Sequence, residues 1–185
     1  AIGLEPGDEV IVSPWTMSAT ATSILVWNAI PVFADVDAET GCLDPSSIEK
    51  KISPHTKGIL VVHQFGFPAE MDRIMDVAKR HNLKVIEDNA QCFLSTYKGR
   101  LTGSIGDIAS YSFENAKHLS CGEGGMIITN SKDLAEKTRK IGGHGFKNLS
   151  ASEGRVRLNK EIFQNPDYKR HDTLGWNYRM AELLA

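Results

Sequence analysis

The 185-residue sequence predicts an α/β fold with a mostly parallel, mixed sheet flanked by helices. Short runs rich in Val, Ile and Phe recur along most of the chain and are typical of buried strands. Segments with helical character lie between several of these runs, and strand–helix–strand spacing of this kind favours parallel pairing through right-handed crossovers. The expected strands cover residues 9–13, 31–36, 58–62, 84–88 and 108–113.

Apolar residues recur at i, i+3, i+4 and i+7 from Met71 to Ala78, which predicts an amphipathic helix over 71–81. A further helix is expected over 17–28, and Pro31, just beyond its end, prevents the helix from continuing.

Ser131 can cap a third helix, which Gly142-Gly143 can end.

Residues 125–130 follow the preceding strand after a glycine-rich turn without an intervening helix, so we expect an antiparallel strand there. From 145 to 172 no apolar period is visible and basic residues outnumber acidic ones. A solvated surface insertion is the favoured interpretation, and a loop that grips substrate or a partner stays open.

Composition excludes several classes of function. Lys and Arg number 21, Asp and Glu 23, and the formal net charge is −2, which gives no support for binding to nucleic acid or to an anionic membrane. No apolar stretch approaches the roughly 20 residues of a membrane span, and no secretory signal is recognisable. Three cysteines without a C-x-x-C pair indicate a reducing, cytoplasmic setting. A zinc site made of His63, Cys92 and Cys121 is much less favoured than buried structural thiols.

The residues that follow the strands are the candidates for function, because ligands of parallel sheets bind beyond the carboxyl ends of the strands. Glu87 and Asp88 end one strand, and since side chains alternate between the faces of a strand, only one of the two can face a pocket. Lys117 lies between another buried strand and the glycine-rich turn 122–125. Such a lysine suits Schiff-base chemistry, although a surface lysine on a loop is an equally open interpretation.

Three of these segments, 87–91, 112–117 and 122–125, resemble the DegT/DnrJ/EryC1/StrS family of fold-type-I sugar aminotransferases, which depend on pyridoxal phosphate. The resemblance covers nearly the whole chain outside 145–172. It implies that residues 1–185 are the cofactor-binding large domain, in a fragment that lacks the N-terminal phosphate-binding segment and the C-terminal small domain. Further matching segments are 7–11, 31–33, His63 with Gly66, 97–99, 144–145 and 175–179.

The resemblance also implies roles for single residues. Lys117 resembles the lysine that forms the Schiff base with the cofactor and then carries the proton, and Asp88 resembles the partner of the pyridine nitrogen. Gln91 is similar to the residue beside the ring hydroxyl, and Ser112 to a phosphate ligand. Asn177 resembles the residue that reaches the phosphate of the partner subunit's cofactor, which implies a homodimer with shared active sites.

Two positions depart from the family pattern. Met17 stands where the family usually has an aromatic residue that stacks on the pyridine ring, and a methionine covers a ring face less rigidly. The neighbouring Trp15 takes over this stacking or faces the substrate. His118 stands where asparagine is frequent, and either shapes the substrate pocket or bonds to the backbone.

By resemblance, the expected reaction moves an amino group from glutamate or glutamine to a keto-sugar, most simply a nucleotide-linked one, in amino-sugar or cell-surface polysaccharide biosynthesis. One alternative is a dehydratase relative that works from pyridoxamine phosphate, but those enzymes replace the lysine by histidine, and here Lys117 is kept. Another alternative is a non-catalytic regulatory or partner-binding fragment. A dinucleotide-binding fold is rejected, because strand 9–13 runs into Pro14-Trp15-Thr16 and not into G-x-G-x-x-G.

Overall fold

The computed structural model describes residues 1–181 and 183–185, which form two compact units. The sheet unit consists of residues 2–128, and the C-terminal unit consists of residues 129–185 together with Ala1.

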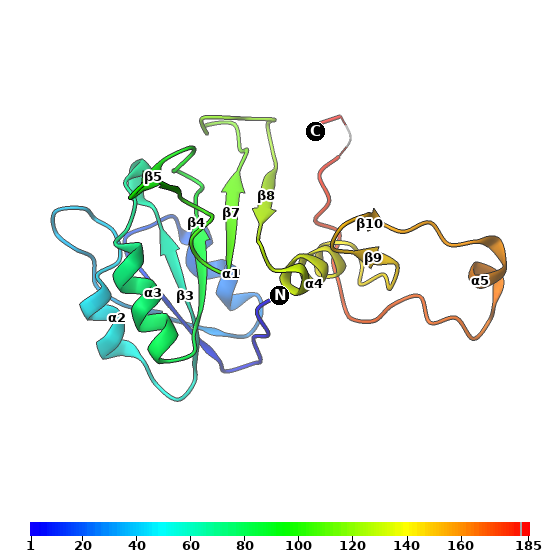
Figure 1. The fold of residues 1–185 in the computed structure, drawn as a ribbon, viewed down its shortest axis with the longest axis horizontal. Coiled ribbons are helices and arrows are strands. Elements are labelled where there is room, and N and C mark those ends of the chain that lie inside the picture. The colour runs from blue at the N-terminus through cyan, green and yellow to red at the C-terminus, as the bar shows by residue number, and fades with distance from the viewer. Residues whose placement is uncertain (182) are drawn as a thin grey trace. The chain divides into compact units, whose positions relative to one another are not determined.

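The sheet unit is built around a six-stranded sheet with the strand order β2-β1-β3-β4-β7-β8 (Figure 1). All neighbouring pairs are parallel except β7 and β8, which are antiparallel. The predicted mixed, mostly parallel sheet and its antiparallel last strand are therefore confirmed. The strands are β1 (Glu9–Val12), β2 (Ile30–Phe33), β3 (Thr56–Val62), β4 (Lys84–Asp88), β7 (Ile108–Ser112) and β8 (Gly125–Ile128).

Alternation along the strands divides the apolar core between the two faces of this sheet. Ile11, Ile59 and Val85 belong to a core cluster with the helices α2 (Pro45–Lys51) and α3 (Met71–Arg80), whereas Val10 and Val62 belong to a second cluster with the helix α1 (Ser18–Leu25). Helices thus cover each face of the sheet, and because both faces are buried the sequences of the central strands are nearly continuous apolar runs. The elements outside the sheet are α1 (Ser18–Leu25), α2 (Pro45–Lys51), the 3-10 turn η1 (Gln64–Gly66), α3 (Met71–Arg80), and the hairpin of β5 (Thr96–Tyr97) and β6 (Arg100–Leu101).

Two helices differ from the sequence-based expectation. α1 ends at Leu25, three residues before the predicted end. α2 was not predicted, although Asp44 accepts a hydrogen bond from the Ser46 N–H (2.9 Å) and Pro45 occupies the first turn, which is a regular helix start. The helix is short, and only one of its faces reaches the core, so its apolar period is too brief to detect.

The C-terminal unit begins with α4 (Lys132–Gly142), which starts and ends as predicted. The Ser131 hydroxyl accepts a hydrogen bond from the Leu134 N–H (3.3 Å), and Gly143 follows the last turn. The segment without apolar period contains the hairpin of β9 (Leu149–Ser150) and β10 (Gly154–Arg155) and the short helix α5 (Lys160–Gln164). Among the residues that the structure describes, no helix combines the length and apolarity that crossing a membrane requires.

Candidate active site

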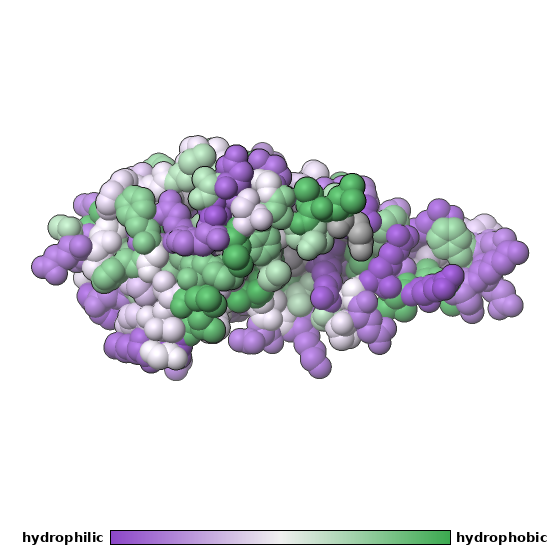
Figure 2. Space-filling model, turned by 90° about the horizontal axis from the view of Figure 1, so that it is seen from above, coloured by the Kyte–Doolittle hydropathy of each residue, from purple (hydrophilic) through white to green (hydrophobic). Residues whose placement is uncertain are grey.

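The carboxyl ends of β4 and β7 form the centre of the candidate site. Asp88, the last residue of β4, is the register partner of Ser110, and Ser112 ends β7 two residues later. Figure 2 looks onto the end of the sheet unit at which the parallel strands finish, and it shows apolar surface exposed there between hydrophilic groups. The half-buried side chains of Asp88 and Ser112 are thus delivered to one edge by neighbouring strands.

The carboxylate of Asp88 is held from two sides. Its Oδ1 atom accepts a hydrogen bond from the Ala90 N–H (3.0 Å), and the Thr20 hydroxyl on α1 donates to Oδ2 (3.4 Å). The oxygen of Thr20 also lies 2.9 Å from the Thr16 hydroxyl, and the Thr20 side chain is buried. Sequence reasoning missed Thr20. The sequence signal that could have identified it is the i, i+4 spacing of Thr16 and Thr20 at the start of the predicted helix.

Glu87 faces the opposite side of the sheet and is fully buried, as strand alternation requires. Its carboxylate accepts hydrogen bonds from the N–H groups of Gly103 (2.7 Å), Ile105 (2.8 Å) and Gly106, and it pairs with His63. Burial by itself raises the pKa of Glu87, but the hydrogen bonds from His63 and from the backbone outweigh it and hold this pKa below its ordinary value. Strand alternation alone left open which of the two carboxylates is accessible at this edge, and in the structure it is the half-buried Asp88.

The metal interpretation considered for His63 finds no support in its contacts. Both ring nitrogens are engaged, Nε2 with Glu87 (2.9 Å) and Nδ1 with the Ala69 N–H (3.1 Å). Cys92 is buried with its Sγ atom 3.4 Å from the Thr102 hydroxyl, and Cys121 is half-buried. Within the described part of the chain, no three His, Cys, Asp or Glu side chains are grouped so that they could hold a metal ion.

Gln91 is half-buried beyond the end of β4, and its Oε1 atom accepts a hydrogen bond from the Phe65 N–H (3.0 Å). The Phe65 ring meets the Trp15 ring edge to face, with 5.8 Å between centroids. Both aromatic side chains are exposed, and so is Met17, which precedes α1. Sequence reasoning did not single out Phe65, because nothing in the local pattern shows the backbone conformation described below.

Lys117 lies in the turn that connects β7 to β8. The turn is closed by backbone hydrogen bonds from Phe113 to Gly124 (2.8 Å) and from Cys121 to Phe113 (3.0 Å). Lys117 is half-buried and its N–H donates to the Glu114 carbonyl (3.0 Å), whereas His118 beside it is exposed. The primary amine is therefore carried by a closed loop that leaves the same strand as Ser112.

Asn177 lies in the C-terminal unit, where residues 143 and 177 form an isolated antiparallel bridge. Its Oδ1 atom accepts a hydrogen bond from Arg179 Nε (2.8 Å). Its role at a partner's cofactor stays a prediction.

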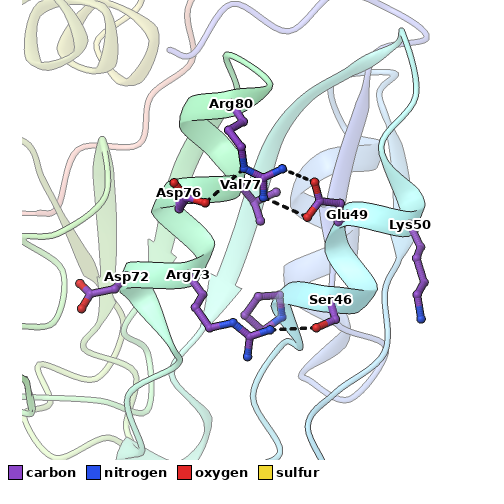
Figure 3. Close-up of a pocket in the computed structure, with 9 residues that line it drawn as sticks. Ser46, Glu49, Lys50, Asp72, Arg73, Asp76, Val77 and Arg80 are labelled. Carbon is purple, nitrogen blue, oxygen red and sulfur yellow. Dashed lines mark hydrogen bonds and ion pairs between the residues drawn. The ribbon is translucent and has the colours of Figure 1, made fainter.

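A cavity of about 540 Å³ lies between α2 and α3 and contains none of the predicted site residues (Figure 3). Arg80 crosses it to the carboxylate of Glu49 and also contacts Asp76 (3.1 Å), and Arg73 donates to Ser46 (2.9 Å). The hydrogen bonds from Arg80 lower the pKa of Glu49 to about 2. The ion pair of Arg80 with Glu49 and the hydrogen bond of Arg73 to Ser46 join the two helices on the outside of the sheet.

Comparison with known proteins identifies the family. A family model described as the DegT/DnrJ/EryC1/StrS aminotransferase family matches residues 1–185. The chain is 48% identical to a GDP-perosamine synthase of Caulobacter vibrioides, over all of this chain and 45% of that protein. It superimposes on the X-ray structure of an aminotransferase from Psychrobacter cryohalolentis with a TM-score of 0.87 and 42% identity, over 99% of this chain and 45% of that one.

NtdA of Bacillus subtilis, solved with its bound cofactor PMP, gives a TM-score of 0.83 at 34% identity, over 99% of this chain and 38% of NtdA. The chain thus spans less than half the length of these proteins. Because the match extends from the first to the last residue, the chain belongs to the DegT/DnrJ/EryC1/StrS aminotransferase family.

Proposed function

We propose that this chain is the cofactor-binding part of a pyridoxal-phosphate-dependent aminotransferase that transfers an amino group from glutamate or glutamine to a nucleotide-linked keto-sugar. Such a reaction serves amino-sugar or cell-surface polysaccharide biosynthesis, in line with the name of the perosamine synthase relative. One observation carries the proposal. The half-buried Asp88 carboxylate stands at the carboxyl edge of the sheet, beside the strand that supplies Ser112 and leads to Lys117.

The chemistry of these side chains fits pyridoxal phosphate. A carboxylate suits a protonated ring nitrogen, a hydroxyl suits a phosphate, and a primary amine suits an aldehyde. Each oxygen of Asp88 accepts one hydrogen bond in the structure and has a second acceptor site left. The cofactor, when bound, supplies an electron sink for the carbanion that forms when the substrate carbon loses its proton.

The protein's own residues then have distinct tasks. Asp88, held in position by its two donors, would keep a proton on the ring nitrogen. The primary amine of Lys117 would hold the cofactor through its aldehyde group with loss of water, and once displaced by the amino donor it would move a proton at the substrate carbon. Ser112 would donate to the phosphate, and Gln91 would lie near the ring hydroxyl. Met17 would cover a ring face through its polarizable side chain.

Substrate and partner contacts complete the proposal. Trp15 and His118, both exposed in the sheet unit, face the sugar. Asn177 reaches the phosphate of the partner subunit's cofactor in a homodimer with shared sites. We place the protein in the cytoplasm, which agrees with three cysteines that form no disulfide bond in the described part of the chain. A lysine at position 117 favours transamination, because the dehydratase relatives of the family have a histidine at this position.

The test is covalent labelling of Lys117. Pyridoxal phosphate is added to this chain and, in parallel, to a form extended to the length of its relatives, and borohydride then fixes any bound cofactor. Peptide mass spectrometry is expected to find the label on Lys117 and to find none in Lys117→Ala. Lys57→Ala, which removes an exposed lysine of the same unit, is the matched control and keeps the label. Labelling that is undiminished in Lys117→Ala in both forms contradicts the proposal.

A further inference from the structure

Phe65 combines two features that each cost free energy. Its backbone has φ 51° and ψ 28°, in the left-handed region that disfavours residues other than glycine. Its side chain is 72% exposed, so the aromatic ring gains little from burial in this chain. Folding alone gives no reason for a phenylalanine at this position. Strained residues of this kind gather at functional sites, where the surrounding structure holds them in place.

The turn that contains Phe65 is held by the segment that follows β4. The Phe65 N–H donates to the side chain of Gln91 (3.0 Å), and the Ser95 hydroxyl donates to the Gly66 carbonyl (2.9 Å). The His63 N–H donates to the carbonyl of Asp88 (3.2 Å). Two of these hydrogen bonds, those to Gln91 and Asp88, tie this turn to residues proposed to bind the cofactor, and all three hold the backbone around Phe65 in place.

Trp15 is held beside it by a different set of contacts. Its N–H donates to the Ser13 hydroxyl (3.0 Å), and its ring lies so close to Gly41 that a Cβ atom added there would be 2.2 Å from it. The indole nevertheless remains 52% exposed. The two rings meet at an interplanar angle of 75°, so together they form an apolar corner that opens to solvent.

We propose that Phe65 determines substrate specificity by packing, with Trp15, against the apolar C–H face of the substrate's sugar ring. This inference rests on the proposed function, which supplies a keto-sugar as the substrate. A hexose presents C–H groups on its ring faces, and these pack well on aromatic surfaces. A phenyl ring has no hydrogen-bonding group and cannot take part in the proton transfers. Phe65 thus contributes to sugar binding and not to the chemical step.

The test compares steady-state kinetics of variants in the protein at the length of its relatives, with a panel of GDP-, UDP- and dTDP-linked keto-hexoses as probes. Phe65→Ala is expected to raise KM for the accepted sugar at least about tenfold while kcat changes less than about twofold. Phe65→Tyr, which keeps the aromatic face, is expected to restore the wild-type KM. Phe67→Ala, which removes another exposed ring from the same loop, is the matched control and leaves both constants unchanged.

Three further measurements distinguish loss of sugar contact from a folding defect, a defect in the donor reaction and weaker nucleotide binding. Phe65→Gly fits the left-handed backbone without strain, so it is expected to unfold at no lower urea concentration than the wild type while showing the same raised KM. The half-reaction with the amino donor alone is expected to be unchanged in Phe65→Ala. Inhibition by the free nucleoside diphosphate is also expected to be unchanged, because the corner holds the sugar and not the base.

The outcomes separate this inference from the proposed function. An active enzyme in which Phe65→Ala keeps its KM overturns the inference alone, as does a slower donor half-reaction or weaker inhibition by the nucleoside diphosphate. A variant that changes only subunit association on size-exclusion chromatography shows that a second copy covers the ring, and this too overturns it. Absence of the label on Lys117 and of any turnover in the wild type overturns the proposed function and the inference together.

Discussion

The Nε2 atom of His63 lies 2.9 Å from the Oε2 atom of Glu87, and both side chains are fully buried. Because Nδ1 of His63 accepts the Ala69 N–H, the ring proton sits on Nε2 and points at the carboxylate. The main-chain N–H of His63 donates to the Asp88 carbonyl (3.2 Å). This pair therefore joins the ends of β3 and β4 at the point where Asp88 is presented.

Glu87→Gln is expected to destabilise the fold by about 3 kcal/mol, because one amide group cannot accept all the hydrogen bonds that the buried carboxylate accepts. Urea denaturation followed by circular dichroism measures the change. Glu70→Gln is the control, since Glu70 pairs with Arg73 on the exposed side of α3 and its loss leaves the midpoint almost unchanged. Equal effects of the two substitutions would contradict a special role for the buried pair.

The depressed pKa of Glu87 predicts a pH dependence of stability. Because the folded-state pKa lies below the ordinary value of 4.5, ionisation of Glu87 stabilises the fold above that pH. The contribution is lost as the pH falls through the folded-state value. Urea midpoints measured from about pH 7 to about pH 3 should therefore fall more steeply in the wild type than in Glu87→Gln. All other carboxylates are common to both proteins, so parallel curves would rule out the effect.

Thr20→Val is expected to lower turnover about tenfold, because it removes the hydroxyl donor to Oδ2 of Asp88 while keeping the shape of the side chain. Thr20→Ser restores the donor and should recover most of the rate. Thr22→Val on the same helix is the control, since the Thr22 hydroxyl bonds to the Ala19 carbonyl. The pH dependence of the bound cofactor's absorbance should shift in Thr20→Val alone. Equal rates in the valine and serine variants would show that Thr20 acts only through packing.

Asp88→Asn tests the proposed contact with the ring nitrogen. The amide preserves the size of the side chain but not its charge, so the cofactor should still be retained in part. The single-turnover rate with the amino donor should fall at least about 100-fold, the size of other electrostatic contributions to catalysis. Asp76→Asn, on the exposed side of α3, is the matched control. A wild-type rate in Asp88→Asn would refute the assignment.

Local features of the sequence determined much of the fold. The apolar runs and the helical period of 71–81 predicted the alternating elements, and Ser131 with Gly142-Gly143 predicted the limits of α4. Strand alternation required Glu87 and Asp88 to face opposite sides, and they do. These predictions succeed because periodicity, capping and alternation depend on neighbours in the chain. The roles of Lys117 and Asn177 rest on resemblance and stay predictions.

Only the tertiary structure decided which partners these residues have. Thr20 and Asp88 are 68 positions apart, and His63 and Glu87 are 24 apart, so their contacts depend on which elements pack together. The left-handed backbone of Phe65 is likewise stabilised by Gln91, 26 residues later. Burial in the assembled sheet strengthens such polar contacts and makes an unpaired group costly. The sequence by itself determined the residues available at the strand ends, and packing selected which of them work together.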